Sequence, residues 1–157
     1  MDQRTWRPIR NIWRVWVVEQ RAIVDTGPLV AFLVKEETHH QWAAQQFQQL
    51  QAPLLTAEAV LTEAFFLLTR VSHGTTKFFE LLDSGLLHVD FSIIGERIAL
   101  EKLVRRYANV PMSLADACLV RLSELYAQAV VFSLDHHFQI YRRHGRQPIP
   151  LLIPPRA

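Results

Sequence analysis

Acidic side chains stand at two points where a short apolar segment ends. The segment AIV runs directly into Asp25, and the segment VVFSL runs directly into Asp135. Ligands of an open parallel sheet bind outside the carboxyl ends of its strands, so both carboxylates are expected at one edge of a sheet. An Asp that follows a strand also caps the next helix, which is the structural alternative for each.

A third acid, Asp116, lies three residues after Ser113 at the start of an apolar helix. This S-x-x-D spacing is typical of a capping box, and capping alone would explain the residue. If the helix opens at the edge where the strands end, the Asp116 carboxylate would also lie beside Asp25. Both interpretations stay open.

Glu63 is the fourth acid, and it lies in the middle of a predicted helix. Ala59 and Leu67 stand one turn away on either side, so we expect Glu63 to be at least partly buried. A buried carboxylate either takes up a proton or finds a cation. Pairing with an arginine such as Arg70 is the structural alternative.

Convergence of these four carboxylates would require a counter-charge. Crowded carboxylates cannot all stay ionised alone, and a cluster of oxygen ligands suits a hard cation such as magnesium or manganese. Such a cation polarises a phosphoryl oxygen and activates a water for in-line attack, and a pair of cations clamps both reacting oxygens. The pattern therefore predicts phosphodiester hydrolysis with one or two metals.

Apolar runs that alternate with helical segments supply the elements that would position these acids. The expected strands are 22–24, 53–55, 85–89, 129–134 and 149–153. The expected helices are 27–34, 39–50, 57–71 with Thr56 as its N-cap, 74–82, 92–108, 113–128 and 135–143. Helices between strands favour a parallel sheet covered on both faces. We predict an α/β fold, a three-layer α/β/α sandwich around a mainly parallel sheet of four to five strands.

Length and composition limit the classes of protein that this chain can represent. Its 157 residues suit a single domain, and a 50% share of hydrophobic residues excludes a disordered chain. One cysteine cannot form an internal disulfide, which favours a reducing compartment and the cytoplasm. We expect no transmembrane segment, because Arg14, Asp25, Glu63 and Asp116 interrupt the apolar runs.

Residues 1–21 differ from the rest of the chain. They hold five Arg and three of the four Trp, and their spacing is consistent with a basic amphipathic helix that docks on a membrane surface or a partner. The alternative is a start codon assigned upstream of the true one. We therefore divide the chain into a basic, Trp-rich extension at 1–21 and a nuclease-like domain at 22–157.

Four motifs in this order and spacing resemble the PIN-domain ribonucleases, especially the VapC-like toxins of bacterial toxin–antitoxin pairs. The motifs are AIVDTGPLVAFL, LTAEAVLTEAFFLL, VPMSLADACLV and VVFSLDHHF. The resemblance implies a magnesium- or manganese-dependent endoribonuclease, often a homodimer, with a VapB-like antitoxin as a partner if the chain is a toxin.

The resemblance also assigns roles to single residues. It implies Asp25, Asp116 and Asp135 as metal ligands and Glu63 as the acidic residue that a helix contributes to the catalytic set. In this family the last acid often holds the metal through water. Thr26 and Ser133 match supporting positions beside the site.

A basic cluster follows the last acid. Arg142, Arg143 and Arg146 could hold RNA phosphates, although a solvated face is the default for a run of charges. His136 and His137 are surface residues or auxiliary groups at the edge of the site. Two rival functions remain: a catalytically silent PIN fold that binds RNA or protein, and a DNA-directed nuclease.

Overall fold

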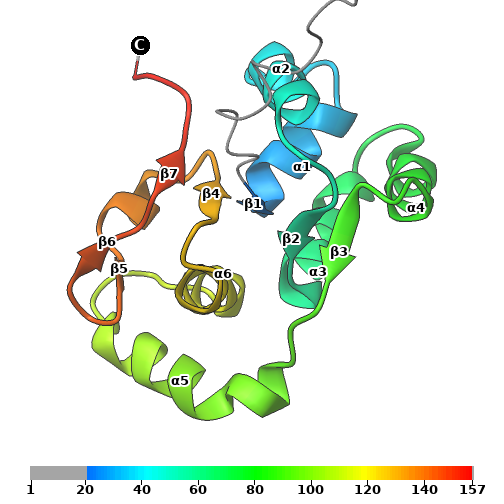
Figure 1. The fold of residues 1–157 in the computed structure, drawn as a ribbon. Helices are drawn as coiled ribbons and strands as arrows, with labels where there is room; N and C mark the ends of the chain where they lie inside the picture. The colour runs from blue at the N-terminus through cyan, green and yellow to red at the C-terminus, as the bar shows by residue number, and fades with distance from the viewer. Residues whose placement is uncertain (1–20, 157) are drawn as a thin grey trace, which may run out of the picture.

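Five short parallel strands form the centre of the molecule, which is known from a computed structural model that describes residues 21–156. The strands are β1 (Ala22–Val24), β2 (Leu54–Thr56), β3 (Leu87–Val89), β4 (Val130–Phe132) and β7 (Leu151–Leu152). They lie side by side in the order β3-β2-β1-β4-β7 (Figure 1). The expected parallel sheet of four to five strands is confirmed.

Six helices cover the two faces of this sheet. They are α1 (Thr26–Leu33), α2 (His40–Gln49), α3 (Glu58–Leu68), α4 (Gly74–Asp83), α5 (Ile93–Arg106) and α6 (Leu114–Leu125). The crossovers from β1 through β2 to β3 run one way along the sheet, and the crossover from β3 to β4 runs back. Right-handed crossovers therefore place α1 to α4 on one face and α5 with α6 on the other, as Figure 1 shows. The three-layer sandwich is confirmed.

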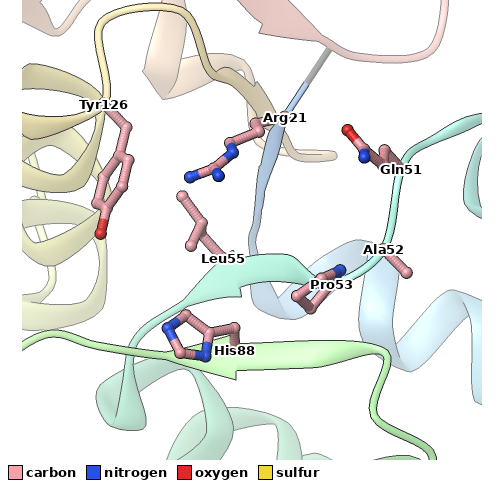
Figure 2. Close-up of a pocket in the computed structure, with 7 residues that line it drawn as sticks. All are labelled: Arg21, Gln51, Ala52, Pro53, Leu55, His88 and Tyr126. Atoms are coloured by element: carbon pink, nitrogen blue, oxygen red, sulfur yellow. The ribbon is translucent and has the colours of Figure 1, made fainter. Parts of the chain in front are cut away.

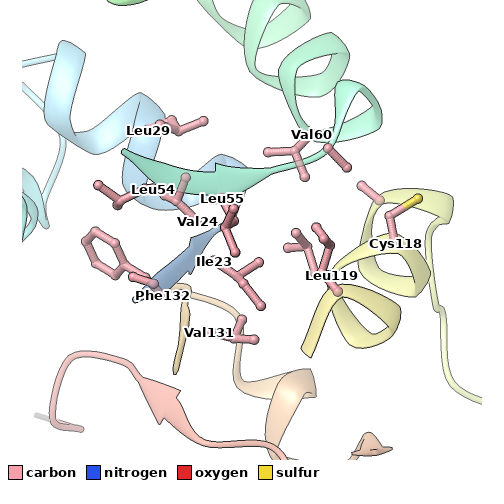
Figure 3. Packing of buried hydrophobic residues seen from close by; sticks show 14 of the residues in the cluster. Ile23, Val24, Leu29, Leu54, Leu55, Val60, Cys118, Leu119, Val131 and Phe132 are labelled. Atoms are coloured by element: carbon pink, nitrogen blue, oxygen red, sulfur yellow. The ribbon is translucent and has the colours of Figure 1, made fainter. Parts of the chain in front are cut away.

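The core lies on both faces of the central strands because successive strand side chains point in opposite directions. Ile23 and Val131 are paired in register and are fully buried toward Leu119 of α6 (Figure 3). On the other face, the Phe132 ring meets Trp42 and Phe47 of α2 at centroid distances of 5.4 and 5.1 Å. The paired strands β1 and β4 are therefore packed between α6 on one face and α2 on the other.

The segment after β4 corrects one expectation. Residues 135–143 form a 3-10 turn (His136–Gln139) and then the strand β5 (Arg142–Arg143), which pairs antiparallel with β6 (Gln147–Pro148). The predicted helix over 135–143 is therefore wrong. Phe138 in the 3-10 turn and Tyr141 two residues after it are both fully buried, so no continuous helix is needed to bury them.

Thr56 also differs from expectation. It is the last residue of β2, and its hydroxyl donates to the Val24 carbonyl at 2.9 Å. The N-cap of α3 is Ala57, without a side-chain hydrogen bond. The Thr56 hydroxyl thus ties β2 to β1 where a helix cap had been expected.

No helix within residues 21–156 is long and apolar enough to span a membrane. The predicted helix in the N-terminal extension lies outside the described residues, of which Arg21 is the first.

Candidate active site at the carboxyl edge of the sheet

Asp25 and Ser133 meet where the neighbouring strands β1 and β4 end. The Ser133 hydroxyl donates to Asp25 Oδ2 at 2.6 Å, and both residues are buried. The crossovers on the two sides of β1 run in opposite directions, so these ends form the switch point at which ligands bind in open α/β sheets. The sequence-based placement of Asp25 agrees with this position.

Asp25 combines a capping role with an unusual electrostatic environment. Its Oδ1 accepts a hydrogen bond from the Thr26 amide at 2.7 Å at the start of α1. Burial raises the pKa of Asp25 to about 6, hydrogen bonds from Ser133 and Thr26 oppose this rise, and the negative charges of Asp116 and Asp135 add to it. Within residues 21–156 no basic side chain forms an ion pair with Asp25. The buried carboxylate is therefore short of positive charge.

Asp116 serves in the predicted capping box and also faces this group. Its amide donates to Ser113 Oγ at 3.0 Å, and its Oδ2 accepts from the Ser113 amide at 3.1 Å. The same Oδ2 accepts from the Tyr141 hydroxyl at 3.2 Å. Burial raises the pKa of Asp116 and the charge of Asp135 adds to the rise, while the hydrogen bonds from Ser113 and Tyr141 lower it. The two interpretations of Asp116 are thus compatible.

Asp135 completes the group of three aspartates. Its amide donates to Ser133 Oγ at 2.9 Å, so one hydroxyl connects Asp135 to Asp25. Asp135 Oδ1 accepts from the His137 amide at 2.8 Å and lies 2.8 Å from His137 Nδ1. Asp135 is only partly buried and stands at the outer side of the site.

Glu63, on α3, is connected to the aspartates through a hydrogen bond with Thr26. Its side chain is exposed, so the expectation of partial burial is wrong. The reason is that α3 buries the stripe formed by Val60, Ala64 and Leu68, which does not include position 63. The Thr26 hydroxyl, buried next to Asp25, donates to Glu63 Oε2 at 3.1 Å.

The alternative of a Glu63–Arg70 pair finds no support among the described residues. The Arg70 guanidinium lies over the Phe66 ring, 4.8 Å from its centroid.

Within residues 21–156, no group of three or more His, Cys, Asp or Glu side chains is placed so that it could hold a metal ion. The three aspartates are electrostatic neighbours, and they do not form a closed ligand shell. Their donor set consists of carboxylate oxygens, which suits a hard divalent cation. Burial, with a further contribution from the charges of Asp116 and Asp135, raises the pKa of Asp25, and a bound cation would oppose that rise. In donor chemistry the residues therefore fit magnesium or manganese.

Comparison with known proteins identifies the family. The family model of the PIN domain matches residues 22–143. The chain belongs to the PIN-domain family. Among solved structures, it is similar to Mycobacterium tuberculosis VapC20, described as a sarcin-ricin loop cleaving toxin. The TM-score is 0.68 at 21% identity, with 81% of this chain and 99% of VapC20 covered. A search of curated protein sequences found no match.

Two of the three predicted RNA-binding arginines of this PIN domain have hydrogen bonds to the backbone. Arg143 Nη1 donates to the carbonyls of Ser123 and Ala127 at 3.0 and 2.9 Å, at the end of α6. Arg142 Nη1 donates to three carbonyls in the turn that precedes it. Arg146 lies within the β5–β6 turn, and its side chain is exposed.

Sequence reasoning missed Tyr141. This fully buried residue packs its ring against Tyr107 and Phe138 at 5.0 and 5.4 Å and directs its hydroxyl to Asp116. Burial, followed by the charge of Asp116, raises the pKa of the Tyr141 phenol. No local pattern marks this tyrosine, because the contact joins the β5–β6 segment to the start of α6.

A pocket of about 290 Å³ lies at the opposite edge of the sheet, where the strands begin. Arg21, Pro53, His88 and Tyr126 are among the residues that line it (Figure 2). None of the predicted catalytic acids lines it. This pocket is therefore separate from the predicted catalytic acids of the PIN domain.

Proposed function

We propose that this chain is a VapC-like endoribonuclease that hydrolyses RNA phosphodiester bonds with magnesium or manganese. The observation that carries the proposal is the buried Asp25 carboxylate, whose pKa is raised to about 6 beside the charges of Asp116 and Asp135. A divalent cation would supply the missing positive charge. Membership of the PIN family supports the same chemistry.

The proposed site assigns a distinct task to each residue. Asp25, Asp116 and Asp135 would hold the metal, and Ser133 and Thr26 hold the Asp25 carboxylate in place through the hydrogen bonds already described. When bound, the cation polarises the phosphoryl oxygen and lowers the pKa of the attacking water. Glu63, oriented by the Thr26 hydroxyl, accepts a proton from that water at its exposed carboxylate.

RNA as substrate rests on the resemblance of the motifs to PIN-domain ribonucleases, and the structural similarity to VapC20, described as a sarcin-ricin loop cleaving toxin, supports it. We propose that exposed Arg146, with the partly buried Arg142 and Arg143 beside it, attracts RNA phosphates. A VapB-like antitoxin, a homodimeric state and a cytoplasmic location belong to the same proposal.

The deciding experiment combines metal binding with cleavage. Magnesium and manganese are titrated calorimetrically into the full-length protein and into Asp116→Asn, and both are incubated with mixed pools of single-stranded RNA and DNA. Asp83→Asn is the matched control, because Asp83 is an exposed acid at the end of α4. Circular dichroism confirms that each variant is folded.

Each outcome selects one function. Metal binding and metal-dependent RNA cleavage that vanish in Asp116→Asn and persist in Asp83→Asn support the proposal. Cleavage of DNA in preference to RNA would replace it with a DNA-directed nuclease. Neither binding nor cleavage would leave a catalytically silent binding module.

A further inference from the structure

A second pocket lies at the same carboxyl edge as the aspartates, at the end of β3. Its volume is about 520 Å³, and Glu58, Asp90, Phe91, Ile93 and Ile94 are among the residues that line it. We call it the β3 pocket. Figure 1 shows β3 at the outer side of the sheet and the chain continuing from it to α5.

Strand register fixes the position of the β3 pocket relative to Asp25. Ile23 pairs with Leu55, and Leu55 pairs with His88. Two residues further along, this register brings Asp25 and Asp90 to equivalent levels of β1 and β3. Neighbouring strands are about 4.8 Å apart, and β2 is the single strand between them. The backbone positions of β1 and β3 at this level are therefore about 10 Å apart along the edge of the sheet.

Neither acidic side chain of the β3 pocket has a structural partner among the described residues. Both Glu58 and Asp90 are exposed, and no hydrogen bond or ion pair of either side-chain carboxylate is found in residues 21–156. Ser92, which also lines the pocket, has its hydroxyl bonded to the Gly95 amide as the N-cap of α5. Two carboxylates are thus available to a ligand.

The lining determines what kind of ligand fits. Ionised carboxylates only accept hydrogen bonds, and two negative charges repel phosphate. Phe91 is partly buried, whereas Ile93 and Ile94 are exposed, and together they offer an apolar surface on which a flat ring can stack. The pocket therefore selects a flat, uncharged ring with adjacent N–H donors.

Among the RNA bases, guanine meets this requirement best. Its Watson–Crick edge presents N1–H beside the N2 amino group, so one carboxylate can accept two parallel hydrogen bonds. Adenine, cytosine and uracil each place an acceptor next to the donor on this edge, which would face the carboxylate unfavourably. Single-stranded RNA is commonly recognised through such edges together with stacking on aromatic side chains.

We propose that the β3 pocket is a guanine-binding subsite, in which Asp90 accepts the base edge and Phe91 stacks on the ring. This proposal rests on the proposed function, because the substrate is RNA whose scissile phosphate lies at Asp25. The subsite would then bind a nucleotide close to the cleaved bond and make the enzyme selective for a guanine at that position.

The test measures RNA binding without cleavage. Labelled hexauridylate and six variants with one guanosine at each position in turn are titrated by fluorescence polarisation into full-length protein in EDTA, which removes divalent cations. One guanosine position is expected to tighten the Kd about tenfold, in the range of one bidentate base contact. Inosine at that position, which lacks the N2 amino group, is expected to recover only part of the gain.

Variants separate Asp90 from general charge effects. Asp90→Asn and Glu58→Gln are compared with Asp83→Asn, which removes an exposed carboxylate outside the pocket. The guanosine preference is expected to fall to twofold or less in Asp90→Asn and to persist in the control. Equal binding of all oligonucleotides to the wild type, no measurable RNA binding, or an unchanged preference in Asp90→Asn would overturn the proposal.

Failure of the subsite and failure of the proposed function remain distinguishable. The binding assay needs no hydrolysis, so an inactive protein that prefers guanosine would keep the subsite and contradict only the nuclease. An active nuclease without any guanosine preference would do the reverse.

Discussion

The Ser133 hydroxyl donates to Asp25 Oδ2 at 2.6 Å across a sequence separation of 108 residues. This hydrogen bond joins the ends of β1 and β4, and the same hydroxyl accepts from the Asp135 amide at 2.9 Å. One serine therefore determines how two of the three aspartates are placed.

Replacement of Ser133 tests this relationship. Ser133→Ala removes a donor from a buried carboxylate, which costs about 1–3 kcal/mol of the free energy of unfolding when the carboxylate is charged. Because the pKa of Asp25 is about 6, the loss is expected to be larger at pH 8 than at pH 5. Urea unfolding at both pH values measures it.

Ser123→Ala is the matched control for that series. Ser123 is equally buried, and its hydroxyl bonds to the Val120 carbonyl within α6. Its cost should not change between pH 5 and pH 8. An equal pH dependence in both variants would contradict the role of Ser133.

Asp25→Asn is expected to stabilise the metal-free protein at neutral pH. The native pKa of about 6 exceeds the ordinary value of 3.8, so the native state holds the proton more tightly than the unfolded chain does. The contribution of the Asp25 carboxyl to the free energy of unfolding is fully present below pH 4. As the pH rises through 6, this contribution of about 3 kcal/mol is lost. Urea unfolding in EDTA at pH 8 measures the gain in the variant, reduced by any hydrogen bond that Asn makes less well. Lower stability of Asp25→Asn than of wild type would show that the carboxylate is structural.

Tyr141→Phe should weaken divalent binding with little loss of packing. The variant keeps the buried ring but removes the Tyr141 hydrogen bond, which in the wild type lowers the pKa of Asp116. Without that bond Asp116 holds its proton more tightly, so protons compete better with the metal. Loss of a charge-assisted hydrogen bond of this kind is expected to weaken manganese affinity roughly threefold to tenfold. Titration calorimetry measures this change.

Tyr107→Phe provides the comparison for Tyr141. The Tyr107 hydroxyl accepts from the Arg142 amide and does not contact Asp116. Its loss is expected to lower stability and leave manganese affinity unchanged. If both variants bound manganese as wild type does, Tyr141 would have no part in the site.

Glu63→Gln is expected to reduce RNA cleavage by about 100-fold, the usual contribution of a general base. Its effect on stability should stay within about 0.5 kcal/mol because the side chain is exposed. Glu80→Gln changes another exposed acid, on α4, and should leave both quantities unaltered. Wild-type turnover in Glu63→Gln would remove Glu63 from the catalytic set.

The two kinds of arginine should behave differently. Arg143→Met removes the donors that the carbonyls of Ser123 and Ala127 receive, so we expect a loss of about 1–2 kcal/mol of stability. Arg146→Met should leave stability unchanged and lower the slope of log binding constant against log salt by about 1 if one phosphate contact is lost. Salt titrations of RNA binding and urea unfolding of both variants separate the two roles.

The sequence predicts the positions of the three aspartates well because each depends on local pattern. Asp25 and Asp135 follow strands, and Asp116 occupies a capping box with Ser113, which the structure contains as predicted. Strand periodicity and helix caps are local properties of the chain. Their convergence follows from the order of the strands in the sheet.

The errors arise where tertiary contacts decide the outcome. Glu63 was expected to be buried from the apolar residues around it, but α3 turns Val60, Ala64 and Leu68 toward the core. Tyr141 and Arg143 contact residues 25 and 20 positions away on α6, and these contacts depend on the β5–β6 turn that the sequence did not predict. Contacts between residues this far apart in the chain leave no recognisable pattern in the neighbouring sequence.

All three aspartates sit at the starts of helical turns as well as in the candidate site. Asp25 is the N-cap of α1, Asp135 is the N-cap of the 3-10 turn, and Asp116 closes the capping box of α6. Asparagine and serine cap helices about as well as aspartate does. Descendants of this chain could therefore lose the negative charges one at a time without losing the fold. In a lineage that is no longer selected for catalysis, we expect uncharged capping residues such as asparagine or serine at these three positions.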